Sequence, residues 1–423
     1  MNRLFVAILP ALLIASYALP AAAEDWPRFR GPTGQGISTE TGVPTQWSAT
    51  ENVAWKTPIP GAGWSSPIVL GDRLFLTTAT DEGRSFRVLC LDRKTGAITW
   101  NKEIVQQEPG NKSGQNSWAT ATPTTDGERV YVLAFDGTTA ALAFDGAIVW
   151  TNRDFKYYSQ HGLGVSPLVW QDLVIVPFDW SSRGPEKRVG WQIPWDQSVI
   201  YAYDKATGKV RWQGKRGLSR IGHVTPQVVS VDGRDQLISP AGDVVQGFDP
   251  KTGECLWTVK NTGEAVVPAI VIGDGLVFAT SGFNNAGSAA LRAVRLGGGK
   301  GDCTATHIAW EQTKAVPMIP SMLYVKPYLY TVAETGMARC LKADTGEMVW
   351  ENRLKGSYSA SPIWAEGRIY FTNERAETTI IQAGPEFKIL AQNAIGEKCQ
   401  ASPAVSQKQI FIRTEGNLYA IGK

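Results

Sequence analysis

The sequence predicts an all-β fold, an eight-bladed β-propeller with four-stranded antiparallel blades. Three observations carry this prediction. A turn repeat ends in tryptophan, a strand repeat begins with proline about every 48 residues, and the last repeat lacks a strand that is present near the N-terminus. Four-stranded units with a period of about 40–50 residues are typical of propellers. The composition agrees, because 43 Gly, 24 Pro and 43% hydrophobic residues indicate a folded, turn-rich chain.

The first repeat is a turn followed by a strand that ends in tryptophan, as in LDRKTGAITW, YDKATGKVRW and KADTGEMVW. Asp opens the turn, and Gly supplies positive φ. An indole at one repeated strand position favours packing between blades over a redox or ligand role. We expect the neighbouring blade's turn to accept its N–H. These structural tryptophans are Trp55, Trp100, Trp150, Trp212, Trp257, Trp310 and Trp350, and the seventh blade has Leu390 at this point.

Apolar and small residues recur beside these tryptophans. The residue two before each Trp is apolar, as Ile98, Ile148 and Met348 show, and strand alternation puts it on the same face. We therefore expect both positions to pack between blades. Cys90 and Cys340 occupy a slot that is small in other blades, so we expect them to be structural. Five cysteines, an odd number, indicate no complete disulfide framework.

The second repeat begins a strand with a small residue and proline, as in SPIVLGDRLFL and SPIWAEGRIYF. Eight such units predict eight blades. The last unit stops without a fourth strand or Trp, whereas NVAWKTPIP, residues 52–60, has the pattern of a fourth strand and includes Trp55. We expect residues 52–60 to pair with the C-terminal blade, because an open ring would leave an exposed edge. The repeated prolines are Pro67, Pro123, Pro167, Pro226, Pro268, Pro320, Pro362 and Pro403.

Residues 1–23 are predicted to be a signal peptide. Arg3 is their only charge, residues 4–19 are largely apolar, and three alanines up to Ala23 suit cleavage. The apolar run is interrupted by Pro10 and is short for a membrane span. We therefore expect a protein that is exported to the periplasm or secreted, soluble after cleavage near Ala23, with no membrane span.

Residues 24–51, which begin with EDWPRFRGPTGQG, are predicted to be an N-terminal strap ahead of the propeller at 52–423. They lead into the closing strand, which is expected to start on the face of the ring that carries the Thr-Gly turns. We therefore expect the segment to reach the ring at the rim of that face, the lower face. We expect the segment to fasten the closure, and the alternative is a catalytic loop. The aromatic residues expected to pack and the arginines expected to pair or to cap carbonyls are Trp26, Phe29, Trp47, Arg28 and Arg30.

Strand alternation assigns the loops to two faces. The blade-to-blade connections and the loops between second and third strands share one face, which we call the upper face, and the Thr-Gly turns lie on the lower face. Four long segments, 101–118, 151–164, 178–198 and 213–222, fall on the upper face over adjacent blades. Long loops without structure of their own are often functional. We expect them to wall a pocket at the channel mouth, and the alternative is a cap that packs on the blades.

Aromatic and cationic side chains are concentrated in these upper-face loops. Such a set suits a planar anionic ligand, a sugar or a peptide. Two of the three histidines are included, but spacing identifies no third metal ligand, so no metal site is predicted. The candidate ligand-binding residues are Trp64, Trp118, His161, Trp180, Arg183, Arg188, Trp191, Trp195, His223, Glu264, Tyr358 and Gln400.

Several function classes lack support in the sequence. Without Arg3 the chain has 41 basic and 39 acidic side chains, which gives no electrostatic footprint for nucleic acid. No CxxCH haem motif, HExxH, GxSxG or P-loop occurs. No catalytic residue and no cofactor are therefore predicted from motifs.

The Asp-x-x-Thr-Gly-x-x-x-Trp repeats resemble the tryptophan-docking repeats of the pyrroloquinoline-quinone (PQQ) propeller superfamily over roughly residues 52–423. That group includes quinoprotein alcohol dehydrogenases and the propeller subunit of the outer-membrane barrel-assembly machine. The resemblance implies two functions. We expect a non-catalytic binding scaffold for an envelope protein, peptide or glycan. The alternative is a PQQ-dependent alcohol or sugar dehydrogenase with Ca²⁺, but the vicinal cysteines typical of those enzymes are missing and no Ca²⁺ ligand set can be assembled.

Overall fold

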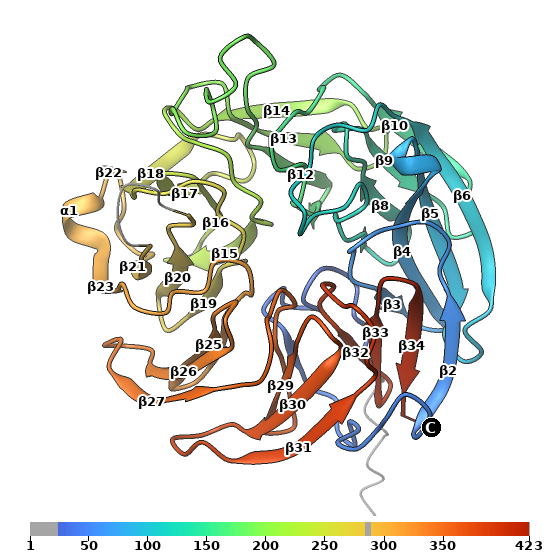
Figure 1. The fold of residues 1–423 in the computed structure, drawn as a ribbon. Helices are drawn as coiled ribbons and strands as arrows, with labels where there is room; N and C mark the ends of the chain where they lie inside the picture. The colour runs from blue at the N-terminus through green and yellow to red at the C-terminus, as the bar shows by residue number, and fades with distance from the viewer. Residues whose placement is uncertain (1–23, 284–288, 423) are drawn as a thin grey trace, which may run out of the picture.

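The computed structural model describes residues 24–283 and 289–422, so the predicted signal peptide lies outside the described residues. The described chain forms eight antiparallel four-stranded blades around a central axis (Figure 1). The all-β, eight-bladed propeller prediction is confirmed. In each blade the first strand lies nearest the axis and the fourth lies outermost, so the loops before the first strands surround the channel.

Two short strands extend this pattern at sheet edges. The strap strand β1 (Ile37–Ser38) pairs in parallel with blade seven, and β22 (Gly301–Asp302) pairs in parallel with blade four. The strands of blades one to four are β3 (Ile68–Leu70), β4 (Arg73–Thr80), β5 (Ser85–Asp92), β6 (Ile98–Gln106); β7 (Thr124–Thr125), β8 (Val130–Leu133), β9 (Thr139–Leu142), β10 (Ile148–Asn152); β11 (Leu168–Trp170), β12 (Leu173–Phe178), β13 (Val199–Asp204), β14 (Val210–Lys215); β15 (Gln227–Val231), β16 (Arg234–Ala241), β17 (Val244–Phe248) and β18 (Cys255–Lys260).

Blade eight takes its fourth strand from the N-terminal side of the chain. Only one α-helix, α1 (Thr304–His307), and one 3-10 turn, η1 (Asp81–Gly83), occur among the described residues. The strands of blades five to eight are β19 (Val271–Gly273), β20 (Leu276–Thr280), β21 (Leu291–Arg295), β23 (Ile308–Gln312); β24 (Leu323–Val325), β25 (Tyr328–Val332), β26 (Met337–Lys342), β27 (Met348–Arg353); β28 (Ile363–Ala365), β29 (Arg368–Thr372), β30 (Glu377–Gln382), β31 (Ile389–Ala394); β32 (Ala404–Ser406), β33 (Gln409–Arg413), β34 (Asn417–Ile421) and β2 (Val53–Pro58).

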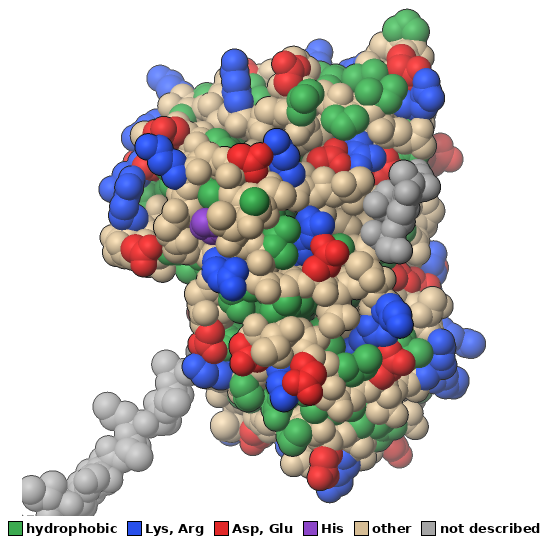
Figure 2. Space-filling view, turned by 90° about the vertical axis from the view of Figure 1, so that its left-hand side faces the viewer, with side chains coloured by type: hydrophobic (Ala, Val, Ile, Leu, Met, Phe, Trp, Pro, Cys, Tyr) green, Lys and Arg blue, Asp and Glu red, His purple; other side chains and the backbone are tan. Residues whose placement is uncertain are grey.

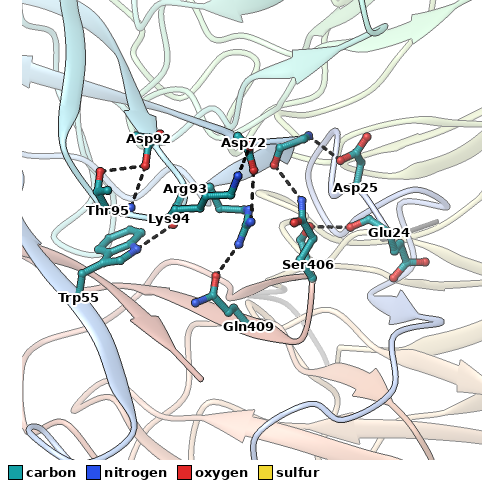
Figure 3. A network of polar contacts seen from close by, with 12 residues as sticks. Glu24, Asp25, Trp55, Asp72, Asp92, Arg93, Lys94, Thr95, Ser406 and Gln409 are labelled. Atoms are coloured by element: carbon teal, nitrogen blue, oxygen red, sulfur yellow. Dashed lines mark hydrogen bonds and ion pairs between the residues drawn. The ribbon is translucent and has the colours of Figure 1, made fainter. Parts of the chain in front are cut away.

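The ring closes through β2, which pairs antiparallel with β34 and places Trp55 opposite Ala420. This confirms the predicted pairing of the two chain ends. Figure 3 shows the polar contacts that join blade eight to blade one. The Trp55 indole donates to the Arg93 carbonyl at 2.8 Å. The Arg93 guanidinium donates to Gln409 in blade eight at 2.8 Å and pairs with Asp72 at 3.3 Å.

Six repeated tryptophans reach the lower turn of the next blade, as predicted. Trp150 donates to the Lys205 carbonyl at 2.9 Å. A Cβ on Gly208 would lie 2.5 Å from the Trp150 ring, so this turn needs glycine for the indole as well as for its φ of +71°. The six N–H contacts, at 2.8–3.2 Å, are Trp55 to Arg93, Trp100 to Phe144, Trp150 to Lys205, Trp212 to Pro250, Trp310 to Ala343 and Trp350 to Gly384.

Trp257 is the exception to this prediction. Its indole donates to the Gln236 side chain of its own blade at 2.8 Å. The next blade has no Asp-Thr-Gly turn at this point, because residues 296–300 form an irregular segment that leads into β22 and packs Gly299 against the indole. The hydrogen-bond acceptor of a repeated indole therefore depends on the turn in the next blade.

A β-bulge in the fourth strand makes two other predictions wrong. These are the packing of the residue two before each Trp and the alignment of Leu390 with the Trp position. In all eight blades the register between the third and fourth strands shifts just before the Trp position. The extra residue breaks the alternation, so Ile148 is 39% exposed while Trp150 is only 8% exposed. The same register places Ala391, rather than the predicted Leu390, opposite Ile380 in blade seven.

The small slot predicted from the cysteines lies beneath the repeated tryptophans. Cys90 pairs across the ladder with Trp100, and Cys340 pairs with Trp350. Alanine or glycine fills the same position in other blades, such as Ala202 opposite Trp212. All five cysteines are free thiols. A small side chain at this position leaves room for the indole above it.

Across residues 24–283 and 289–422, no helix has the length and apolar character needed to cross a membrane. Figure 2 shows the outer side of the ring near α1, where basic and acidic side chains are interspersed.

We predict that Gly208→Ala lowers the free energy of unfolding by about 3 kcal/mol, because the new methyl group meets a buried indole in a closely packed site. Gly233→Ala is the matched control, since its φ is +77° but nothing lies within 4 Å of its Cβ position. It should cost only the left-handed strain, about 1 kcal/mol. Chemical denaturation of both variants measures the difference. Equal losses would show that the indole contact adds nothing to the turn.

Candidate functional site

An axial cavity of about 400 Å³ lies at the upper end of the channel. The long upper-face segments converge on it, because Asn116, His161 and Trp191 each come from a different one and His223 directly follows the fourth. Strands β6, β10 and β14 run two to six residues further than expected, so these segments begin later than predicted. The cavity collects six of the twelve predicted residues: Trp64, His161, Trp191, His223, Glu264 and Gln400.

A belt of hydroxyl groups surrounds this cavity. The Ser or Thr beside the repeated proline accepts a backbone N–H from the preceding blade. Ser66 N–H donates to Thr122 at 2.9 Å, Thr122 to Ser166 at 2.9 Å, and Ser166 to Thr225 at 3.0 Å. These hydrogen bonds join the inner ends of adjacent blades and place the hydroxyl oxygens at the cavity wall. A second run, at 2.9–3.0 Å, joins Ala269 to Ser321, Ser321 to Ser361 and Ser361 to Ser402.

The strap crosses the lower end of the channel. Phe29, at the centre of the crossing, lines the axial cavity from below. Trp26 is fully buried and pairs with Val69 at the inner strand of blade one. Hydrogen bonds from residues 24–47 reach blades one, two, four, five, six, seven and eight. Arg30, one of the arginines expected to cap carbonyls, donates to the Met322 carbonyl. The cavity therefore has a floor made by the strap.

His223 is the most unusual polar side chain in the cavity. Its residue surface is 8% exposed, and neither ring nitrogen has a hydrogen-bond partner among residues 24–283 and 289–422. Burial, with a smaller effect of His161, lowers the pKa of His223 to about 3. Burial also lowers the pKa of His161. Its ring contacts the Trp191 indole edge-on, with the ring centres 5.1 Å apart. His223 is thus a neutral imidazole that faces the cavity at neutral pH.

Glu264, one of the candidate ligand-binding residues, is buried. It is 3% exposed, and its carboxylate lies 3.7 Å from the Arg220 guanidinium. Arg220 also pairs with Asp243 at 2.5 Å. The charge of Glu264 is therefore partly neutralised from the protein side.

The other six predicted residues lie outside the axial cavity. Trp118 packs on Gly83 with Lys112 above its ring at 4.8 Å. Trp180 and Trp195 contact one another, with ring centres 4.6 Å apart, and Trp180 donates to a backbone carbonyl at 2.9 Å. Tyr358 is buried and donates to a carbonyl of its own loop. These aromatic residues support the loops, as the capping alternative predicted.

Arg183 lines a second cavity, of about 710 Å³, between the insertion 179–198 and the upper side of blade two with the connections that flank that blade. We call it the basic cleft. Arg183 and Lys187 lie over the Tyr158 ring at 5.6 and 5.8 Å. Four cations and two acids line the cleft with four aromatic rings: Arg153, Lys156, Arg183, Lys187, Glu108, Asp136, Phe135, Phe155, Tyr157 and Tyr158. Arg188 lies outside both cavities in an exposed pair with Glu186.

A buried ion pair fixes the base of the insertion. The side chains of Asp179 and Arg216 are 1% and 0% exposed, and their Oδ2 and Nη2 atoms lie 3.0 Å apart. Arg216 also donates to the Ser239 carbonyl and hydroxyl in blade four at 2.9 and 2.8 Å. Burial raises the pKa of Asp179, and the pairing counteracts this rise. The insertion is thus attached to two blades rather than hanging freely.

The axial cavity does not fit PQQ with Ca²⁺. That cofactor carries carboxylates that need cations, and Ca²⁺ needs six to eight oxygen ligands with carboxylates among them. No Lys or Arg occurs among the described residues lining the cavity, and its one carboxylate, Glu264, is paired with Arg220. Nor do three His, Cys, Asp or Glu side chains cluster in a metal-binding arrangement anywhere in the described part of the chain.

Eight blades around an upper-face cavity, six of them docked to the next blade through a repeated tryptophan, define a PQQ-like β-propeller. Comparison with family models agrees. The family described as "Outer membrane protein assembly factor BamB" matches residues 45–215, 193–306 and 244–384, and the chain belongs to this family. A comparison with curated proteins gave no match.

Solved structures with the same fold include very different proteins. BamB from Moraxella catarrhalis is 16% identical, with a TM-score of 0.58 over 88% of this chain and 97% of that chain. A europium-containing methanol dehydrogenase is 12% identical, with a TM-score of 0.68 over 93% and 90%. The computationally designed Ika8 protein is 10% identical, with a TM-score of 0.58 over 92% and 99%. At these identities the likeness concerns the fold alone.

We predict that His223 makes the protein less stable in acid. The folded protein keeps His223 neutral down to about pH 3, whereas the unfolded chain takes up a proton near its ordinary pKa of about 6.5. Stability is therefore lost as the pH falls from 6.5 towards 3, by at most about 1.4 kcal/mol per pH unit. Denaturation curves from pH 7 to 4 should be flatter for His223→Phe than for the wild type. Identical slopes would contradict a buried neutral imidazole.

We also predict that Asp179→Ala lowers the free energy of unfolding by about 3–5 kcal/mol, because it leaves the Arg216 charge buried without its partner. Glu186→Ala, which breaks the exposed pair with Arg188, is the control and should leave stability unchanged within error. Thermal and chemical denaturation measure both. A small loss for Asp179→Ala would mean that the insertion is not anchored by this pair.

Proposed function

We propose that this protein is an exported, non-catalytic scaffold that binds a protein partner through its upper face. The observation that carries the proposal is the basic cleft, where four cations against two acids stand beside four aromatic rings. Arg153 is paired with Asp136 at 3.2 Å. Lys156 is exposed and Lys187 contacts only a backbone carbonyl and an aromatic face. Such a cleft suits an extended acidic peptide with aromatic or apolar side chains.

Family membership supports the same class of function. The matching family is described as an outer membrane protein assembly factor, which suggests an envelope-associated protein with a protein partner. The apolar residues 4–19 and the alanines before residue 24 support export. The anchored insertion supports a binding role as well, because a fixed wall loses less conformational freedom when a partner binds.

A quinoprotein dehydrogenase is the second candidate. The methanol dehydrogenase neighbour, with a TM-score of 0.68, favours it at the level of fold. The cavity chemistry weighs against it, because neither the cations for the cofactor carboxylates nor a Ca²⁺ ligand set lines the axial cavity. Titration with PQQ and Ca²⁺, followed by absorbance and dye-linked alcohol oxidation, decides the matter. Saturable uptake with turnover would replace the scaffold proposal.

The test of the scaffold is charge reversal in the cleft. We predict that Lys156→Glu with Lys187→Glu weakens partner capture from an envelope extract at least tenfold, because both cations attract the same acidic segment. Lys209→Glu with Lys251→Glu is the matched control, since both residues lie in exposed lower-face turns. Quantitative mass spectrometry at low and high salt measures the captured proteins. Equal capture by both double variants would remove the cleft from the proposal.

A further inference from the structure

We infer that the axial cavity is a second binding site, which takes one uncharged sugar unit of a glycan. This inference concerns a different site from the basic cleft and does not depend on the proposed protein partner. It rests on unused hydrogen-bonding groups, on the small charge of the wall and on the aromatic rings that face the cavity. Its volume of about 400 Å³ lies within the range of small-molecule sites.

The hydroxyl belt leaves donors unused. Thr122, Ser166 and Ser402 each accept a backbone N–H at 2.9 Å. A hydroxyl that accepts one hydrogen bond still has its own proton to donate. Within the described residues, none of these three hydroxyls donates to a protein acceptor, and all three line the cavity. The wall therefore offers several O–H donors at fixed positions, spaced around the axis.

Two further polar groups lack partners. The His223 ring is more than nine-tenths buried and lines the cavity with both nitrogens unpaired. The Gln400 side-chain oxygen is buried and also has no partner among the described residues. Buried polar groups without partners are costly and rare in folded proteins. A neutral imidazole has one donor and one acceptor, and a sugar hydroxyl can satisfy either.

The charge of the wall selects against ionic ligands. No cation occurs among the described lining residues, and the one carboxylate, Glu264, faces Arg220 at 3.7 Å. An anionic ligand would lose its hydration without gaining an ion pair, which is unfavourable in a buried site. A hydroxyl-rich neutral ligand replaces its hydrogen bonds to water with hydrogen bonds to the hydroxyl belt, His223 and Gln400.

Aromatic rings complete the site. Phe29 of the strap lies at the floor, while Trp64 and Trp191 line the wall. The edge-on contact with His161 at 5.1 Å supports the Trp191 indole. The face of an aromatic ring is electron-rich and attracts the slightly positive C–H groups of a sugar face. The cavity thus offers polar groups for the hydroxyls and apolar rings for the C–H faces.

The experiment is an array of neutral and anionic glycans probed with the labelled mature protein, followed by calorimetric titration of the neutral glycans that bind. We expect one saturable site for neutral glycans and at least tenfold weaker binding of glycans whose terminal sugar carries a carboxylate. His223→Phe and Gln400→Leu should each weaken binding at least tenfold. The control Lys187→Ala, in the basic cleft, should bind as the wild type does.

Circular dichroism and the melting temperature establish that each variant is folded. If His223→Phe does not fold, Gln400→Leu alone decides the outcome. Absence of neutral glycan binding across the array overturns the inference, as does equal binding of the carboxylated glycans or unchanged binding by Gln400→Leu. The double variant Lys156→Glu with Lys187→Glu should bind glycans normally, so failure of the scaffold proposal and failure of this inference give different results.

Discussion

The contact between a repeated indole and the turn of the next blade holds this ring together. The indole is buried, so its N–H needs an acceptor, and the turn carbonyl of the neighbouring blade supplies it. The contact requires a glycine in that turn and a small residue under the ring, such as Cys90 beneath Trp100. The bulge before each Trp position turns the preceding apolar residue outward and the indole inward. The same contact, made by Trp55, joins the last blade to the first.

This arrangement leaves the two faces with different roles. On the lower face the turns receive the indoles, and the strap covers the channel end through bonds to seven blades. On the upper face the connections do not receive the repeated indoles, so they can be long and can differ between blades. The insertion 179–198, the basic cleft and the axial cavity all lie there. The hydroxyl belt has a structural role and a role in the site, because it bonds adjacent blades and forms the cavity wall.

Periodic features were predictable from the sequence, and features that depend on one particular neighbour were not. The prolines repeat in every blade and the tryptophans in all but blade seven, so blade number and closure followed. Leu390 was misplaced because the bulge shifts the register by one residue, which spacing alone does not reveal. The Ser and Thr beside the repeated prolines indicated only the start of a strand, and the circumferential bonds appear once blades are adjacent. The lack of a partner for His223 and the pairing of Glu264 with Arg220 likewise depend on loops far apart in the chain.

The strap has a consequence for the assembly of the ring. Residues 24–58 precede the ring in the chain, yet β1, β2 and the residues between them contact strands as late as β34. In a chain made from its N-terminus, β2 has no partner until the final blade is complete, although the residues before it can already contact earlier blades. Over that interval the β34 and β2 edges lack each other, and unpaired strand edges are sites of aggregation. The molecule therefore has most need of a holding chaperone late in its synthesis, after seven of its blades have already been made.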